Sequence, residues 1–410
     1  MQHFQSQNQL NYRARKASEF LIIPAFFFLP IQAAPVNSLL VLAIFFWLFT
    51  GNLKQQLVEA WQHPLTKAFL FFAFSAWISL LWTENIDLGL WFAKKYITYL
   101  VFPIVLLLIR PDFLRYYLGA FFAGIALSEL LSYGLWLDII ELERANPDHT
   151  AFIGHILYSP IVAFATYIML SRLVLFWKEQ PIWQKITLMF FSSTIIVNLF
   201  FTHGRTGMVA LIFLLFTLLL LKFPNHKVKA ILGSFFISAT LLTTTYFSLN
   251  DFKQRVDVAY HDIEQLINHQ NAVTSVGNRL VNWVYSAQMI QQNPILGVGL
   301  GDYGEEFSLI AKQQNFQTVE SSINPHNQYL FSWTTSGIIG IISLFTLFWV
   351  MIQLTYKTQT NKEIHVIRWG LIVLFAVICL AESYLWRSNT GLLLLLFSAL
   401  LFPIPRPPDT

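Results

Sequence analysis

Apolar runs long enough to cross a lipid bilayer recur from Phe20 to Phe402 in this 410-residue chain. A membrane-spanning helix needs about 20 predominantly apolar residues to cross the hydrocarbon core. The composition agrees, because 55% of the residues are hydrophobic and only 12% are charged, whereas roughly 25% of residues are charged in soluble domains. These features exclude a chain that folds into several soluble domains. They predict an all-α polytopic integral membrane protein.

The hydropathy pattern predicts about twelve transmembrane helices. The expected spans are residues 18–34, 36–50, 65–82, 91–109, 113–137, 152–177, 183–202, 206–222, 229–247, 328–355, 366–385 and 389–404. The first span could be mistaken for a signal peptide, but Pro24, Pro30 and Pro35 argue against one. We therefore expect a tight helical hairpin that turns at Ala33 to Pro35.

Basic residues fall in alternate connections between these spans. They are Arg13, Arg15, Lys16, Lys54, Arg110, Arg115, Lys178, Lys185, Lys222, Lys227, Lys229, Lys357, Lys362, Arg368 and Arg406. Because Lys and Arg are enriched in cytoplasmic loops, both chain termini are predicted in the cytoplasm. The acidic loops and the longest connection are then predicted on the outer side of the membrane.

The longest connection, residues 248–325, separates two predicted membrane domains, 1–247 with about nine spans and 326–410 with about three. Apolar residues in this connection recur at steps of three and four, which indicates two amphipathic helices on the outer surface. The first helix would bury Phe252, Val256, Ala259, Ile263 and Leu266, and the second Val276, Leu280, Trp283, Ala287 and Ile290. A glycine-rich turn at 297–304 follows the second helix.

The sequence Asn324-Pro325-His326-Asn327 stands at the outer mouth of the next span. Asn is a favoured N-cap and Pro is favoured at the first helical position, so we expect His326 in the first helical turn. The positive end of the helix dipole disfavours an imidazolium, and a neutral ring suits a general base. The alternative is an interfacial histidine that hydrogen-bonds to headgroups or loop carbonyls.

Two arginines are predicted on the same side as His326. Arg205 lies in a short turn between two apolar spans, and Arg279 opens the second amphipathic helix after Ser275. Guanidinium and free backbone N–H groups at a helix start can bind one anion. The alternatives are that Arg205 reaches lipid headgroups and that Arg279 is a solvated surface charge.

Four further cations are weaker candidates for binding the same anion. They are Lys94, Lys95, Arg144 and Arg387. Headgroup phosphates are the alternative ligand for all four. Lys94 and Lys95 point about 100° apart on a helix, so we expect at most one of them to face a site.

Nucleotide and metal chemistry have little support in the sequence. Residues 299–304 match the dinucleotide fingerprint G-x-G-x-x-G, but no strand is expected before them, so a turn with positive φ angles is favoured. Asp302, Glu305 and Glu306 could hold a divalent cation, although a hydrated loop surface is favoured. The single cysteine, Cys379, excludes a disulfide framework. We expect metal-independent chemistry without a cofactor, and no nucleic-acid partner.

Three stretches resemble the O-antigen ligase and polymerase superfamily of bacterial envelopes. They are residues 202–209, residues 297–304, and the motif His326, Asn327, Gly337 and Gly340. The histidine motif is the most specific, and the predicted topology fits the family along nearly the whole chain. The resemblance implies a glycosyltransferase of the bacterial inner membrane with its active site facing the periplasm.

The resemblance also implies the substrates and the residue roles. The donor would be a glycan on undecaprenyl diphosphate, and in the ligases the acceptor is a sugar hydroxyl of the lipid A core. His326 would be the catalytic base, while Arg205 and Arg279 would grip the diphosphate. Independently of the resemblance, the further candidates for substrate binding are Lys94, Lys95, Asn327, Arg144 and Arg387. The activated carrier removes the need for ATP, and direct displacement with one base predicts inversion at the anomeric carbon.

Three alternatives to the ligase stay open. A polymerase would use a second lipid-linked repeat unit as acceptor. A protein-directed oligosaccharyltransferase is disfavoured because many of these enzymes are longer and carry a soluble C-terminal domain. A transporter of lipid-linked sugars would suit about twelve spans, but transporters tend to have repeated halves, whereas the predicted arrangement here is nine spans followed by three.

Overall fold

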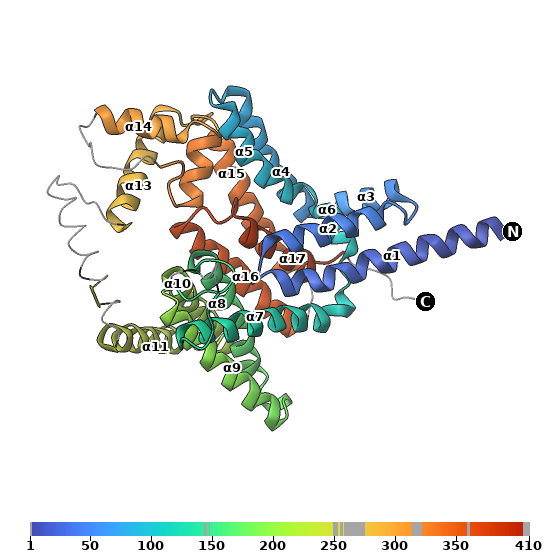
Figure 1. Cartoon of the computed structure of the whole chain (residues 1–410), viewed down its shortest axis with the longest axis horizontal. Helices are drawn as coiled ribbons and strands as arrows, with labels where there is room; N and C mark the ends of the chain where they lie inside the picture. Colours follow the sequence, from blue (N-terminus) through green and yellow to red (C-terminus); the bar gives the residue numbers. More distant parts are fainter. Residues whose placement is uncertain are drawn as a thin grey trace.

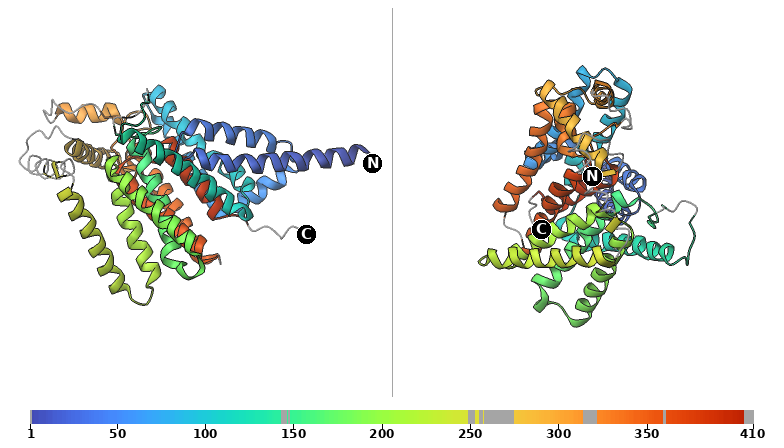
Figure 2. Two further views of the ribbon diagram at one scale, coloured as in Figure 1. Left: turned by 60° about the horizontal axis from the view of Figure 1, so that its bottom comes forward. Right: turned by 90° about the vertical axis from the view of Figure 1, so that its left-hand side faces the viewer.

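The computed structural model describes residues 2–142, 146, 148–248, 253–254, 257, 275–313, 322–358 and 361–404. These residues form helices and connections, with no strand among them. The helices are α1 Gln2–Phe28, α2 Ala33–Trp47, α3 Leu53–Gln62, α4 Pro64–Ile78, α5 Ile86–Leu100, α6 Phe102–Leu108, α7 Leu114–Trp136, α8 His155–Leu175, α9 Ile182–Phe201, α10 Arg205–Lys222, α11 Lys227–Ser248, α13 Ser275–Gln292, α14 Tyr303–Gln313, α15 Gln328–Lys357, α16 Lys362–Ala381 and α17 Ser388–Leu401. Figures 1 and 2 show α13 and α14 at one end of the molecule, while the beginning of α1 projects from the other.

Eight helical segments of the described residues are long and apolar enough to cross a membrane. They are Pro64–Trp82, Ile86–Leu108, Pro111–Trp136, His155–Leu175, Ile182–Phe201, Arg205–Lys222, Gln328–Lys357 and Lys362–Ala381. The shorter helices α2 and α17 are also apolar. The all-helical membrane class is therefore confirmed, whereas the count of twelve spans and the domain boundaries at 247 and 325 stay predictions.

Proline positions explain where two predicted spans differ from the observed helices. The predicted hairpin is present, but α1 ends at Phe28 and α2 begins at Ala33, so the turn lies just before Ala33 to Pro35. Pro35 falls in the first turn of α2, where its missing N–H is not needed. The predicted span 91–109 is divided into α5 and α6, because Pro103, in the first turn of α6, has no N–H to continue the hydrogen bonds of α5.

Helix α17 lies at the centre of the bundle. Every residue from Asn389 to Leu401 is buried, and α2, α5, α6, α8 and α16 contact the helix. A helix that is apolar on all sides is stable when neighbours cover its whole surface. Because α17 is fixed in this way, it also fixes the residues that precede it.

Helix α15 is interrupted at Gly337, which has a φ angle of +61°. The segment after α13 supplies hydrogen bonds to the backbone around this interruption. Val298 N–H donates to the Thr334 carbonyl at 2.7 Å, and Ile338 N–H donates to the Ile295 carbonyl at 3.1 Å. A helix break within a bilayer requires such replacement partners, so the glycine-rich segment and the kinked helix form one structural unit.

The glycine-rich turn also holds the connection between α4 and α5. Leu300 N–H donates to the Thr83 hydroxyl at 2.8 Å, and the backbone N–H groups of Glu84 and Asn85 donate to Asp302 at 3.0 and 2.7 Å. Asp302 is 5% exposed. The expected hydrated loop surface is therefore wrong for Asp302, whose carboxylate joins two parts of the fold.

The connection between the membrane segments contains a helix that was not expected. Helix α14 follows the glycine turn where a polar loop was predicted, and it forms a small apolar core with α13. The core residues of α13 are Val281, Tyr285 and Met289. The helical period of α13 was correct, but Ala287 on the predicted apolar face is exposed. The other predicted amphipathic helix, from Phe252 to Leu266, lies outside the described residues.

Replacement of Gly337 by alanine tests the interruption in α15. A Cβ atom at Gly337 would lie 2.0 Å from the Ile295 carbonyl oxygen, and the backbone angles of Gly337, φ 61° and ψ −153°, lie in a region that is essentially restricted to glycine. Gly337→Ala should therefore lower the midpoint of thermal unfolding in detergent. Gly119→Ala is the control, because a Cβ there meets no atom within 4 Å. Equal unfolding midpoints for the two variants would contradict this account of the break.

Candidate active site

His326 lies immediately before α15 and not inside its first turn. The N-cap is Asn327, whose side-chain oxygen accepts hydrogen bonds from Tyr329 and Leu330 N–H at 3.0 and 3.2 Å. The sequence pattern indicates Asn324 as the N-cap, and this prediction is wrong. Its side-chain oxygen instead accepts the His326 backbone N–H at 2.8 Å.

The backbone of His326 has a φ angle of +50°, which is uncommon for a residue other than glycine. The surrounding contacts hold this conformation in place. Trp283 Nε1 on α13 donates to the Pro325 carbonyl at 3.1 Å, and the Ser322 hydroxyl donates to the Asn324 carbonyl at 2.6 Å. Left-handed non-glycine residues are concentrated at functional sites, and here the conformation directs the imidazole toward the connection between α16 and α17.

The partner of His326 is Glu382, a carboxylate that sequence reasoning missed. His326 Nδ1 lies 2.7 Å from Glu382 Oε2. The Glu382 side chain is 1% exposed and that of His326 is 33% exposed. The expected effect of the helix dipole on the imidazole is thus replaced by a much closer interaction with a buried carboxylate.

Two more groups complete the surroundings of Glu382. Arg387 Nη2 lies 3.4 Å from Oε2, and Ser383 N–H donates to Oε1 at 2.9 Å. Burial raises the pKa of Glu382, but the hydrogen bond and charge of His326, the charge of Arg387 and the Ser383 N–H outweigh it. The pKa of Glu382 therefore lies below its ordinary value, and the group is a carboxylate at neutral pH.

Arg387 and Lys95 each lie over one ring of a pair of neighbouring tryptophans. The Arg387 guanidinium lies 4.6 Å from the Trp386 ring centroid, and Lys95 Nζ lies 5.0 Å from that of Trp91. The two indole rings are 5.6 Å apart. Lys95 is half-buried beside this aromatic pair, whereas Lys94 is exposed. The geometry therefore separates the two lysines, and Lys95 is the one near the site.

Tyr384 lies in the connection between α16 and α17, and its contacts relate Arg205 and Arg279 to this connection. Its hydroxyl donates to the Ile156 carbonyl at 2.8 Å and is hydrogen-bonded by Thr206. Burial and the charge of Glu382 raise the pKa of Tyr384, while the charges of Arg279 and Arg387 lower it. Arg279 on α13 thus lies within electrostatic range of the Glu382 site.

Arg205 is the first residue of α10 and its side chain is exposed. It directly precedes Thr206, which contacts Tyr384. The start of α10 is therefore anchored next to the connection that carries Glu382. Arg144 lies outside the described residues, so its predicted role is not tested.

The arrangement can orient a proton acceptor. In the neutral form of His326, a hydrogen bond from Nδ1–H to the ionised Glu382 leaves the other ring nitrogen, Nε2, without a proton. This is the division of labour by which a carboxylate fixes the tautomer of a catalytic histidine. Arg279 places positive charge nearby, where a developing anion would be stabilised.

One comparison with known protein families matches part of this chain. Residues 188–345 match the family model described as O-antigen ligase. The matched residues include Arg205, Arg279 and His326 but end before Glu382 and Arg387.

Two curated relatives share parts of the sequence. An uncharacterized protein of Haemophilus influenzae is 29% identical over 190 residues, which is 45% of this chain and 46% of that protein. An O-antigen ligase of Salmonella typhimurium is 34% identical over 76 residues, which is 18% of this chain and 19% of that protein. The aligned part is thus less than half the length of each curated relative.

The ion pair at Glu382 predicts a pH-dependent stability difference. Because its native pKa is lowered, the stabilisation by the carboxylate is complete above the ordinary glutamate pKa of about 4.3, and it is lost as the pH falls through the native pKa. Glu382→Gln should cost on the order of 2 kcal/mol at neutral pH.

Thermal unfolding of both proteins between pH 7 and pH 3 checks this expectation. The difference between their midpoints should shrink on acidification below about pH 4.3. Glu141 is exposed, so Glu141→Gln should match the wild-type protein throughout. A gap between wild type and Glu382→Gln that stays constant with pH would contradict the ion pair.

Proposed function

We propose that this chain, whose residues 188–345 match the family model described as O-antigen ligase, is a glycosyltransferase of the bacterial inner membrane. The donor is a glycan linked to undecaprenyl diphosphate, and the acceptor is a sugar hydroxyl of the lipid A core. The observation that carries this proposal is the contact between His326 and the buried carboxylate of Glu382. The reaction takes place at the periplasmic face, and both chain termini lie in the cytoplasm.

The acceptor hydroxyl is activated by His326. Attack by a hydroxyl on an anomeric carbon requires a base for the proton of the attacking oxygen. The Nε2 atom of His326 receives this proton, and the resulting imidazolium is stabilised by Glu382, 2.7 Å from Nδ1. Glu382 touches no reacting atom in this scheme, so it is a positioning residue.

The departing diphosphate is bound by Arg279 and Arg205. A guanidinium stays charged and forms two parallel hydrogen bonds to phosphate oxygens. Such bonds stabilise the negative charge that develops as the glycosidic bond breaks. Arg279 is half-buried on α13, the helix that also anchors the His326 loop through Trp283. The same helix therefore positions the group that binds the anion and the loop that carries the base.

Arg387, which the sequence offers as a substrate-binding residue, contacts Glu382. Its guanidinium lies 3.4 Å from Glu382 and stacks on Trp386. We assign it to holding the Glu382 carboxylate in position. Lys95, on the facing tryptophan, remains available for the outer part of the lipid-linked donor.

One base and one displacement lead to inversion at the anomeric carbon. The acceptor oxygen attacks from the face opposite the diphosphate, the glycosidic bond to phosphate breaks, and undecaprenyl diphosphate leaves with the electron pair. The polymerase reaction would use the same groups with a lipid-linked repeat unit as acceptor, so the acceptor decides between the two activities.

A transfer assay with the purified protein tests the proposed function. Lipid-linked glycan is supplied with or without rough lipopolysaccharide, and products are separated as a mobility ladder. We expect lipopolysaccharide-linked product only when the rough acceptor is present, and none from His326→Ala. Longer lipid-linked chains in the absence of rough lipopolysaccharide would replace the ligase with a polymerase. The absence of any product from folded protein would contradict glycosyl transfer and favour transport.

A further inference from the structure

A polar cavity lies at the end of α17 that is remote from the candidate active site. Ile404, which lines the cavity, follows the end of α17, whereas Arg387 precedes its start. The cavity has a volume of about 390 Å³ and lies between α1, α3 and α6. Pockets for small ligands have volumes of roughly 300–1,000 Å³, so the cavity can hold a group of this size.

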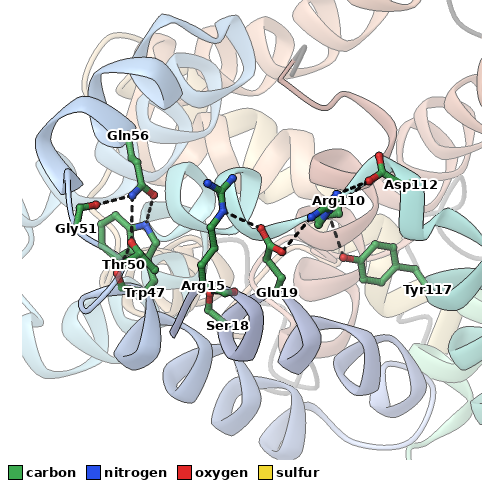
Figure 3. Close-up of polar contacts among 10 residues, drawn as sticks. All are labelled: Arg15, Ser18, Glu19, Trp47, Thr50, Gly51, Gln56, Arg110, Asp112 and Tyr117. Atoms are coloured by element: carbon green, nitrogen blue, oxygen red, sulfur yellow. Dashed lines mark hydrogen bonds and ion pairs between the residues drawn. The ribbon is translucent and has the colours of Figure 1, made fainter. Parts of the chain in front are cut away.

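One wall of the cavity is a fixed polar network. Trp47 Nε1 donates to Gln56 Oε1 at 2.9 Å, and Gln56 Nε2 donates to the Thr50 hydroxyl and the Gly51 carbonyl at 3.0 and 2.8 Å (Figure 3). Gln56 thereby uses both ends of its amide to hold the connection between α2 and α3. The wall is in place before any ligand enters, which reduces the entropy lost on binding.

The positive group of the cavity is Arg15. Its Nε atom donates to Glu19 Oε1 at 3.1 Å, and Arg110 Nη1 lies 3.6 Å from the other oxygen of Glu19. The Glu19 side chain is 4% exposed and that of Arg15 is 57% exposed. Figure 3 shows the terminal nitrogens of Arg15 turned away from Glu19. Glu19 is thus compensated by two arginines and orients the guanidinium of Arg15.

The negative group of the cavity is Glu59 on α3. It is exposed and lines the same cavity as Arg15. Among the described residues no ion pair joins Glu59 to a basic group. The charged side chains that line the cavity are thus Arg15, Glu19 and Glu59. Arg15 and Arg110 both pair with Glu19, whereas Glu59, on a different helix, is not neutralised by Arg15. This pattern is complementary to a ligand that carries both charges.

The apolar part of the cavity and the surface of α3 indicate a lipid. Leu107 and Leu108 of α6 line the cavity next to the polar groups. Helix α3 exposes Leu57, Val58 and Trp61 and also carries Lys54, as expected for an amphipathic helix at the bilayer interface. The polar groups thus lie at the depth of lipid headgroups.

We propose that this cavity binds the headgroup of a phosphatidylethanolamine lipid. The phosphodiester accepts hydrogen bonds from the terminal nitrogens of Arg15, the primary ammonium donates to Glu59, and the acyl chains extend along Leu107 and Leu108. Phosphatidylglycerol would leave Glu59 without a counter-charge, and phosphatidylcholine has no N–H to donate. The site is independent of the glycan-transfer chemistry, since α17 separates the two.

Native mass spectrometry of the full chain in detergent tests this site. The protein is mixed with equal amounts of phosphatidylethanolamine, phosphatidylglycerol and phosphatidylcholine, and the retained adducts are counted. We expect one retained phosphatidylethanolamine. Arg15→Gln should reduce retention by about tenfold, the effect of one charge-assisted hydrogen bond. Glu59→Gln should remove the preference over phosphatidylglycerol.

Arg13→Gln is the matched control, because Arg13 is exposed on the same helix and does not line the cavity. It should retain the lipid as the wild-type protein does. Glu59→Gln changes an exposed side chain, so it keeps the test valid if Arg15→Gln fails to fold. Equal retention of the three lipids, or equal loss in Arg13→Gln and Arg15→Gln, would overturn the proposal. Binding of soluble phosphoethanolamine without lipid retention would also overturn it.

Discussion

The buried carboxylate of Glu382 requires compensation, and the structure around the candidate site supplies it. A carboxylate that is 1% exposed is tolerated only when it is hydrogen-bonded and paired with positive charge. The compensating groups are His326, Arg387 and the Ser383 N–H. Two of these stand at the starts of different helices. Their meeting point therefore depends on how α15 and α17 are placed.

The placement of α15 depends in turn on the break at Gly337. The interruption frees backbone groups, and the segment after α13 binds them through Val298, Gly299 and Ile295. The same segment holds the α4–α5 connection through Asp302. In a bilayer these groups would have no water to replace their partners. The first part of α15, which follows His326, is thus fixed by backbone hydrogen bonds on one side and by the Glu382 loop on the other.

Much of this arrangement can be predicted from the sequence, because apolar length and glycine chemistry act locally. The helical membrane class, the first hairpin, α13 and the positive φ angles at Gly297 and Gly299 all follow from such signals. His326 could be singled out because it follows a proline at the mouth of a span.

The missed features depend on contacts between distant parts of the chain. Glu382 was hidden in the predicted span 366–385, although a carboxylate at the end of an apolar run is itself a functional signal. Its partner His326 is 56 residues away in the chain, and no periodicity reveals that contact. The N-cap was assigned to Asn324 because Asn324 and Asn327 have the same propensity. The backbone path before α15, which only the structure shows, decides that Asn327 caps the helix.

The buried face of α13 was also missed, since its partner α14 was not expected. Val281, Tyr285 and Met289 are buried only because α14 packs against them. An isolated amphipathic pattern would place the helix on the membrane surface. Tertiary packing therefore determines which face of α13 is buried, and with it the direction in which Arg279 points.

In the proposed reaction, His326 is oriented by Glu382 and accepts the proton of the attacking hydroxyl. The most direct test is the single-turnover rate of glycan transfer by His326→Ala, in detergent, with saturating lipid-linked donor and rough lipopolysaccharide. We expect a loss of about 10²–10⁴-fold, the usual contribution of a general base, with unfolding behaviour like that of the wild-type protein. A rate equal to that of the wild-type protein would contradict it.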